Sequence, residues 1–133
     1  MIKNLLKPVA IGIIACVVSA CSTLDGIEPS DKGITIDAKN KSYDEVWKSS
    51  VSAMSTNLAI VDIDKAQGVI KSEAPAGMGT WGEVVGLFIT PTSKAERSYS
   101  IHVVSKKRST FQITGQNWAP SVAARIKADL DVE

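Results

Sequence analysis

The sequence predicts an α+β domain: an antiparallel β-sheet of four to five strands with two helices packed on one face. Three observations support this prediction. Several short segments alternate apolar and polar residues and are joined in pairs by short polar turns, which is typical of antiparallel strands. Two further segments repeat apolar residues at helical spacing, and strands separate them along the chain. The length of 133 residues is that of a single domain.

The composition is that of a folded, nearly neutral protein. Hydrophobic residues make up 44% of the chain and charged residues 22%, which is typical of globular domains. The 15 basic and 14 acidic side chains nearly balance, and this excludes strong electrostatic attraction to nucleic acid.

The N-terminus has the features of an export signal. Lys3 and Lys7 precede an uncharged apolar run over residues 9–20, which matches the basic and hydrophobic regions of a signal peptide. A helix over this run would rise about 18 Å, which is too short to cross a hydrocarbon core of about 30 Å. We therefore expect residues 1–20 to be cleaved.

The end of this run, Val18-Ser19-Ala20-Cys21, resembles the lipobox of bacterial lipoproteins. The resemblance implies cleavage before Cys21 and acylation of its thiol and amino group, giving a permanent membrane anchor. Ser22 implies the outer membrane, because an aspartate at this position tends to retain lipoproteins at the inner membrane. We expect the mature chain to face the periplasm.

Cleavage also changes the charge and the cysteine content. It removes two of the 15 basic residues and no acidic residue, so the 13 that remain against 14 acidic residues give a net charge of −1. It also removes Cys16, which leaves Cys21 as the single cysteine. An internal disulfide is therefore excluded, and the domain must be stabilised by packing.

Residues 21–33 are expected to be the lipidated cysteine and a flexible tether, because 22–33 are rich in Gly, Pro, Ser and Asp. The domain is expected over 34–133. It begins with a strand over 34–38 and a helix over 43–58. Ser42 and Glu45 form a capping box before an apolar stripe at helical spacing. The stripe consists of Trp47, Val51, Met54 and Leu58.

Two hairpins and a second helix follow. The first hairpin joins strands 59–64 and 69–74 through a loop over 65–68, in which Gly68 is expected to take a positive φ. The second joins strands 98–105 and 110–114 through a basic turn over 106–109. A helix over 119–130 ends the domain, with Asn117 as a capping residue and Pro120 in the first turn.

The helix start at 43–47, the strand ending in Asp64 and the turn into 68–70 resemble the helix-grip modules of BamC, a lipoprotein of the outer-membrane β-barrel assembly machine. The likeness covers about 30 residues, and this chain has room for one such module where BamC carries two. It implies an accessory, non-catalytic envelope lipoprotein with a helix-grip fold.

Residues 77–82 match the pattern G-x-G-x-x-G of dinucleotide-binding loops. The residues that follow are β-branched and end at Pro91, so the required helix is missing and a mobile loop is expected. The apolar run over 84–89 has two interpretations. It is either a buried strand at the sheet centre or an exposed patch in which Trp81, Leu87 and Phe88 contact a partner.

No catalytic or metal site is predicted. His102 is the single histidine, and it is expected in solvent on the polar face of its strand. Asp62 and Asp64 lack the further oxygen ligands of a calcium loop, and no zinc-type cluster occurs. No cofactor is expected.

We therefore expect an outer-membrane-anchored lipoprotein that acts as an accessory or interaction module of an envelope assembly. Its partners would be the membrane, through Cys21, and an envelope protein. The alternative is a periplasmic carrier of a small ligand or metal, with the 77–82 loop as a lid over a cavity. The oligomeric state and the partner's identity do not follow from the sequence.

Overall fold

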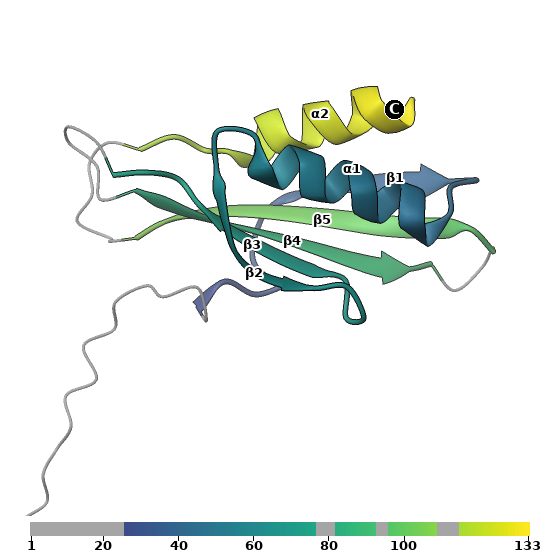
Figure 1. Ribbon diagram of the computed structural model, residues 1–133, viewed down its shortest axis with the longest axis horizontal. Helices are drawn as coiled ribbons and strands as arrows, with labels where there is room; N and C mark the ends of the chain where they lie inside the picture. Colours follow the sequence, from purple (N-terminus) through teal and green to yellow (C-terminus); the bar gives the residue numbers. More distant parts are fainter. Residues whose placement is uncertain (1–25, 77–81, 93–95, 109–114) are drawn as a thin grey trace, which may run out of the picture.

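The computed structural model describes residues 26–76, 82–92, 96–108 and 115–133 (Figure 1). All pairings in its five-stranded sheet are antiparallel, and the strand order is β1-β5-β4-β3-β2. Both helices lie on one face of the sheet, so the predicted α+β class is confirmed. The elements are β1 (Ile34–Lys39), α1 (Tyr43–Ser55), β2 (Ala59–Asp64), β3 (Val69–Glu73), β4 (Glu83–Pro91), β5 (Ser98–Lys107) and α2 (Ala119–Leu130).

Strand β4 forms the centre of the sheet and is buried on both faces. Val85, Leu87 and Ile89 belong to the main core between the sheet and the helices. Val84 and Phe88 belong to a smaller apolar cluster on the opposite, open face. Because both faces are covered, β4 is an uninterrupted apolar run, and the buried-strand interpretation of residues 84–89 is confirmed.

Helix α1 begins with the predicted capping box: the backbone N–H of Ser42 donates to Glu45 and that of Glu45 donates to the Ser42 hydroxyl. The expected end at residue 58 is wrong. The hydroxyls of Ser55 and Thr56 both donate to the carbonyl of Ser52, and the helix stops at Ser55. Leu58 lies beyond the end of the helix but still packs in the main core, so the apolar spacing continues past the last helical residue.

The first hairpin follows the prediction, and Gly68 has a φ of 71°. A Cβ at Gly68 would lie 2.6 Å from the carbonyl oxygen of Ile89, so glycine also permits the close approach to β4. The predicted basic turn is wrong for its first two residues, because Lys106 and Lys107 pair with β4 as the last residues of β5. The strand expected over 110–114 lies outside the described residues.

Helix α2 begins at Ala119, and Pro120 lies in its first turn as predicted. The expected N-cap Asn117 is wrong by one residue: the N-cap is Trp118, which makes no side-chain capping hydrogen bond, and the Asn117 side chain instead accepts from the backbone N–H of Ala119 at 3.1 Å. The segment that leads into α2 is held by the carboxylate of Glu83, a residue that is only 3% exposed. This group accepts hydrogen bonds from the backbone N–H of Gln116 at 2.8 Å and the indole N–H of Trp118 at 3.4 Å. The start of α2 is thereby tied to the start of β4.

The capping box allows a direct test of α1. Replacing Ser42 by alanine leaves an N-terminal N–H without its acceptor, and we expect the free energy of unfolding to fall by about 1 kcal/mol in urea denaturation. Ser52→Ala is the matched control, because Ser52 is an exposed residue inside the same helix. Equal losses for the two variants would contradict a stabilising cap.

Candidate functional site

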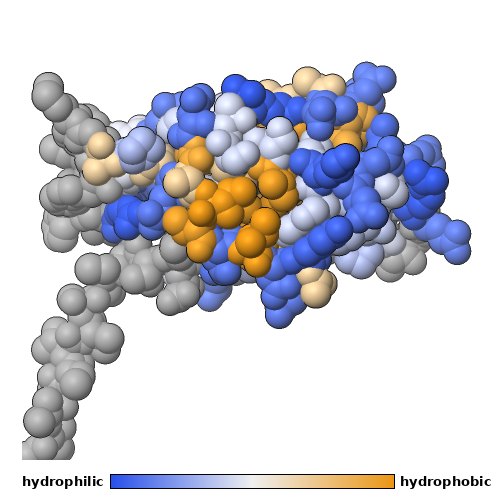
Figure 2. All heavy atoms as spheres, viewed as in Figure 1, coloured by the Kyte–Doolittle hydropathy of each residue, from blue (hydrophilic) through white to orange (hydrophobic). Residues whose placement is uncertain are grey.

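Strand β2 carries an exposed apolar surface at one edge of the sheet. Val61 is 43% exposed and Ile63 is 49% exposed, and these are the large exposed hydrophobic residues of the described chain. We call this pair the edge patch. Figure 2 shows it as part of an apolar area over β2, surrounded by hydrophilic residues. The sheet order leaves the outer side of β2 without a neighbouring strand among the described residues.

The edge patch arises from an irregularity in the pairing of β2 with β3. The register shifts between Ile60 and Asp62, so Val61 is an extra residue without a cross-strand partner. Ile63 lies opposite Ile70, which places it on the helix-covered face but at its outer margin. Both side chains therefore remain accessible although β2 packs beside α1.

The open face of the sheet is crossed by the N-terminal strap, by which we mean residues 26–33. Ile27 is only 3% exposed and packs against Val84, Phe88 and Val104. It sits over Gly86, where a Cβ would come within 3.1 Å of the Ile27 side chain. Glycine at this position thus provides the space in which Ile27 is buried.

Polar contacts hold the strap on both sides of Ile27. The Lys106 ammonium lies 2.7 Å from the Asp31 carboxylate and donates to the carbonyl of Gly26 at 3.1 Å. His102 Nε2 lies 2.8 Å from the carbonyl oxygen of Asp31 and must therefore carry the proton that it donates. Its Nδ1 lies 2.8 Å from the Thr35 hydroxyl, which donates to it when the ring is neutral.

These contacts correct two expectations. The flexible tether predicted for residues 22–33 does not extend over 26–33, because this segment buries Ile27 and makes three polar contacts with β5; residues 22–25 lie outside the described chain. His102 was expected to be a solvated surface residue, but it is half-buried and both ring nitrogens have partners.

The predicted partner-contact residues do not form a surface. Leu87 is fully buried under the helices, and Phe88 is 6% exposed beneath the strap, so the prediction is wrong for both. Trp81 lies outside the described residues, as does most of the 77–82 loop. The edge patch on β2 was missed, because strict alternation cannot reveal an extra residue in a strand.

The described residues hold no cluster of three or more His, Cys, Asp or Glu that could bind a metal ion. Asp62 is exposed, and Asp64 accepts a hydrogen bond from the backbone of Gln67 within the hairpin loop. An open hollow of about 470 Å³ lies beside the described end of the 77–82 loop. Its two charged lining residues, Glu73 and Arg108, form an ion pair with each other.

No family model matches the chain, and no curated protein matches it either. None of the helices among the described residues has the length and apolar character needed to span a membrane.

The contact between Ile27 and Gly86 can be tested by adding a side chain at residue 86. Gly86→Ala places a methyl group against Ile27 and Phe88, and we expect the free energy of unfolding to fall by about 1 to 3 kcal/mol in urea denaturation. Gly26→Ala is the control, since nothing lies within 4 Å of a Cβ there. An unchanged stability of Gly86→Ala would show that Ile27 is not seated over Gly86.

The strap should also respond to acid. The hydrogen bond from the Lys106 ammonium, followed by that from the Glu28 backbone, holds the pKa of Asp31 below its usual value of 3.8. A lowered pKa in the folded state means that ionised Asp31 stabilises the protein above the unfolded pKa, and this contribution is lost as the pH falls through the folded pKa. We expect Asp31→Asn to be less stable than wild type at pH 6, with a difference that begins to shrink only near pH 3.8 and vanishes as the pH falls further, through the lowered pKa of the folded state. Urea denaturation over this range measures it, and a difference that grows on acidification would contradict the contact.

Proposed function

We propose that the chain is a non-catalytic interaction module of the bacterial envelope, held at the periplasmic side of the outer membrane by acylated Cys21. The anchor is supported by the lipobox at residues 18–21 and by Ser22 after it. The interaction role is supported by one structural observation above all: β2 is an edge strand with Val61 and Ile63 exposed. Soluble domains usually shield exposed edge strands and apolar patches, and those that stay exposed often mark interaction sites.

The edge patch suits an extended segment of a partner protein. A strand added beside β2 would gain main-chain hydrogen bonds along the edge that no described strand occupies, and its apolar side chains would cover Val61 and Ile63. Asp62 and Asp64 add negative charge to the same strand, which favours basic residues in the partner. A second copy of this chain would bring two acidic β2 strands together, and this repulsion argues for a different protein as the partner.

The contacts of His102 support a role without catalysis. A general base needs a free nitrogen near a nucleophile, whereas both ring nitrogens of His102 are engaged by the strap and by Thr35. The alternative of a ligand or metal carrier gains no support from the hollow beside the 77–82 loop. That hollow is open, and its charged residues are paired with each other.

The proposal is tested by site-specific photo-crosslinking in intact cells that make the lipidated protein. A photoreactive residue at Ile63 should give one discrete protein adduct, with the crosslinked peptide an extended segment that contains Lys or Arg. The same residue at Asp37, an exposed position on the opposite edge strand β1, is the control and should give none. Adducts of equal yield at both positions, or at neither, would contradict a contact surface on β2.

Two further variants separate the parts of the proposal. Val61→Lys should lower the adduct yield about tenfold, the effect of losing ~1.4 kcal/mol of apolar contact, without unfolding a domain in which Val61 is 43% exposed.

Cys21→Ala should release the protein from the membrane, and intact mass measurement of the wild type should show acyl chains on Cys21. A wild-type protein without acyl chains would refute the anchor.

A further inference from the structure

The N-terminal strap shortens the free connection between the anchor and the domain. If Cys21 is acylated, as the proposed function requires, the chain from Cys21 to Gly26 spans five residue steps, which reach at most about 18 Å. A tether that stayed free through residue 33 would allow more than twice that reach. Because Ile27 and Asp31 are docked on the sheet, the domain is held by the shorter connection.

The strap also selects which end of the domain lies near the anchor. The carbonyl of Gly26 accepts a hydrogen bond from Lys106, the penultimate residue of β5. Ser98, at the other end of β5, pairs with Lys39 at the end of β1. Nine residue steps separate Ser98 from Lys107, which corresponds to about 30 Å along the strand. In Figure 1 the docked N-terminal segment lies nearer the end of β5 that contains Lys106, whereas β1 runs toward the opposite end of the sheet.

The end near Gly26 carries basic side chains. Lys106 and Arg108 are paired with Asp31 and Glu73, while Lys32 and Lys107 are exposed. We call the surface around Gly26, Lys106 and Lys107 the anchor end. Ammonium groups held close to a bilayer contact the phosphate of lipid headgroups. A short tether and exposed lysines therefore favour the same arrangement.

We propose that the anchor end lies against the phospholipid headgroups and that the opposite end of the sheet points away from the membrane. The edge patch runs along the side of the sheet, so it stays open to a partner beside the domain. The short connection is the primary cause of this orientation, and the charge of Lys107 is secondary.

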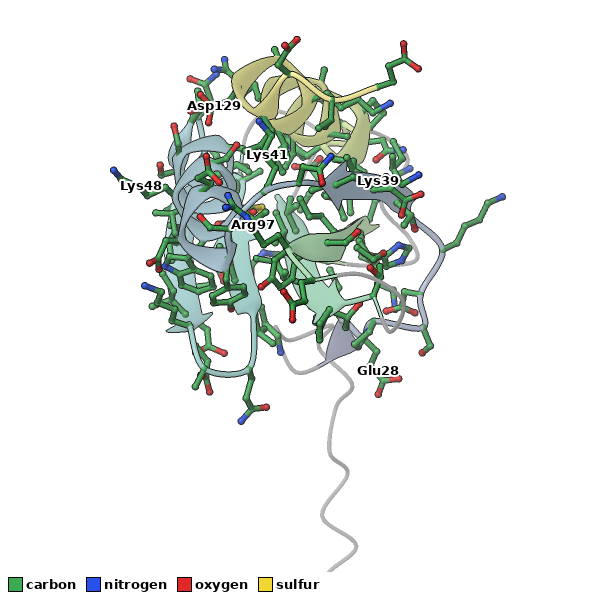
Figure 3. The ribbon with its side chains drawn as sticks, turned by 90° about the vertical axis from the view of Figure 1, so that its right-hand side faces the viewer. Glu28, Lys39, Lys41, Lys48, Arg97 and Asp129 are labelled. Carbon is green, nitrogen blue, oxygen red and sulfur yellow. The ribbon has the colours of Figure 1, made fainter. Side chains whose placement is uncertain are left out.

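A second basic group makes the proposal testable against an alternative. Figure 3 looks onto the end of the domain far from Gly26, where three basic residues lie. Lys39 is the last residue of β1, and the backbone N–H of Lys41 donates to the carbonyl of Arg97 at 3.0 Å. Glu45 lies 3.5 Å from Arg97 and offsets part of this charge. If charge alone oriented the domain, this far end would compete for an anionic membrane.

The test is fluorescence quenching from the bilayer surface. Lys107→Cys and Lys39→Cys each supply the one reactive thiol of the mature lipoprotein, because Cys16 is removed with the signal and Cys21 is acylated. The labelled proteins are reconstituted into vesicles of phosphatidylethanolamine and phosphatidylglycerol that contain a headgroup-linked nitroxide quencher. We expect quenching at residue 107 to exceed that at residue 39 at least twofold, and equal or reversed quenching would overturn the proposal.

Two controls identify the cause. Ten Gly and Ser residues inserted between Asp25 and Gly26 lengthen the connection without touching the fold, and they should remove the difference between the two labels. In vesicles of phosphatidylcholine alone the difference should persist, and its disappearance there would overturn the tether as the primary cause. Mass measurement of the same samples distinguishes this failure from a failure of the proposed function, which would appear as a protein without acyl chains.

Discussion

The contact between Ile27 and the open face of the sheet is the constraint on which the rest of the structure depends. Strand β4 is apolar on both faces, and the two helices cover only one of them. Ile27 covers the cluster of Val84, Phe88 and Val104 on the opposite face. Burial of a side chain of this size contributes about 1.5 to 3 kcal/mol, a large share of the stability of a small domain. The segment that would link the domain to the proposed membrane anchor is thus also part of the core.

This double role connects the fold to the proposed function. A tether that serves only as a spacer lets a domain reorient freely, whereas a tether that ends in a buried side chain fixes one end of the domain near the bilayer. The polar contacts of Asp31 with Lys106 and His102 set the direction in which the strap leaves the sheet. In the proposed arrangement, the exposed β2 edge lies along the flank of an oriented domain, where a partner at the same membrane can reach it.

The sequence was sufficient for the elements whose signals are local. Alternation and turn chemistry located the strands of the first hairpin and Gly68, and the capping box located the start of α1. The predictions were wrong where the structure depends on contacts between residues that are distant in the sequence. The apolar spacing continued to Leu58 although the helix stops at Ser55, and three consecutive basic residues suggested a turn where Lys106 and Lys107 continue the ladder with β4.

The candidate sites were less predictable for the same reason. Ile27 meets Gly86 across 59 positions of sequence, and neither residue alone indicates the contact. A glycine inside an apolar strand is nevertheless a sign of close approach by another segment, and the isolated Ile27 in a polar stretch was available to fill it. The edge patch depends on the bulge at Val61, which no periodic pattern encodes.

The most direct test of this account is a distance measurement across the strap. Nitroxide labels at residues 28 and 39, both exposed positions, report whether the N-terminal segment is fixed relative to the far end of the sheet (Figure 3). Pulsed electron spin resonance should give one narrow distance distribution, which broadens in the Gly86→Ala variant. A broad distribution in the wild type, typical of a free chain, would contradict the docked strap and the orientation derived from it.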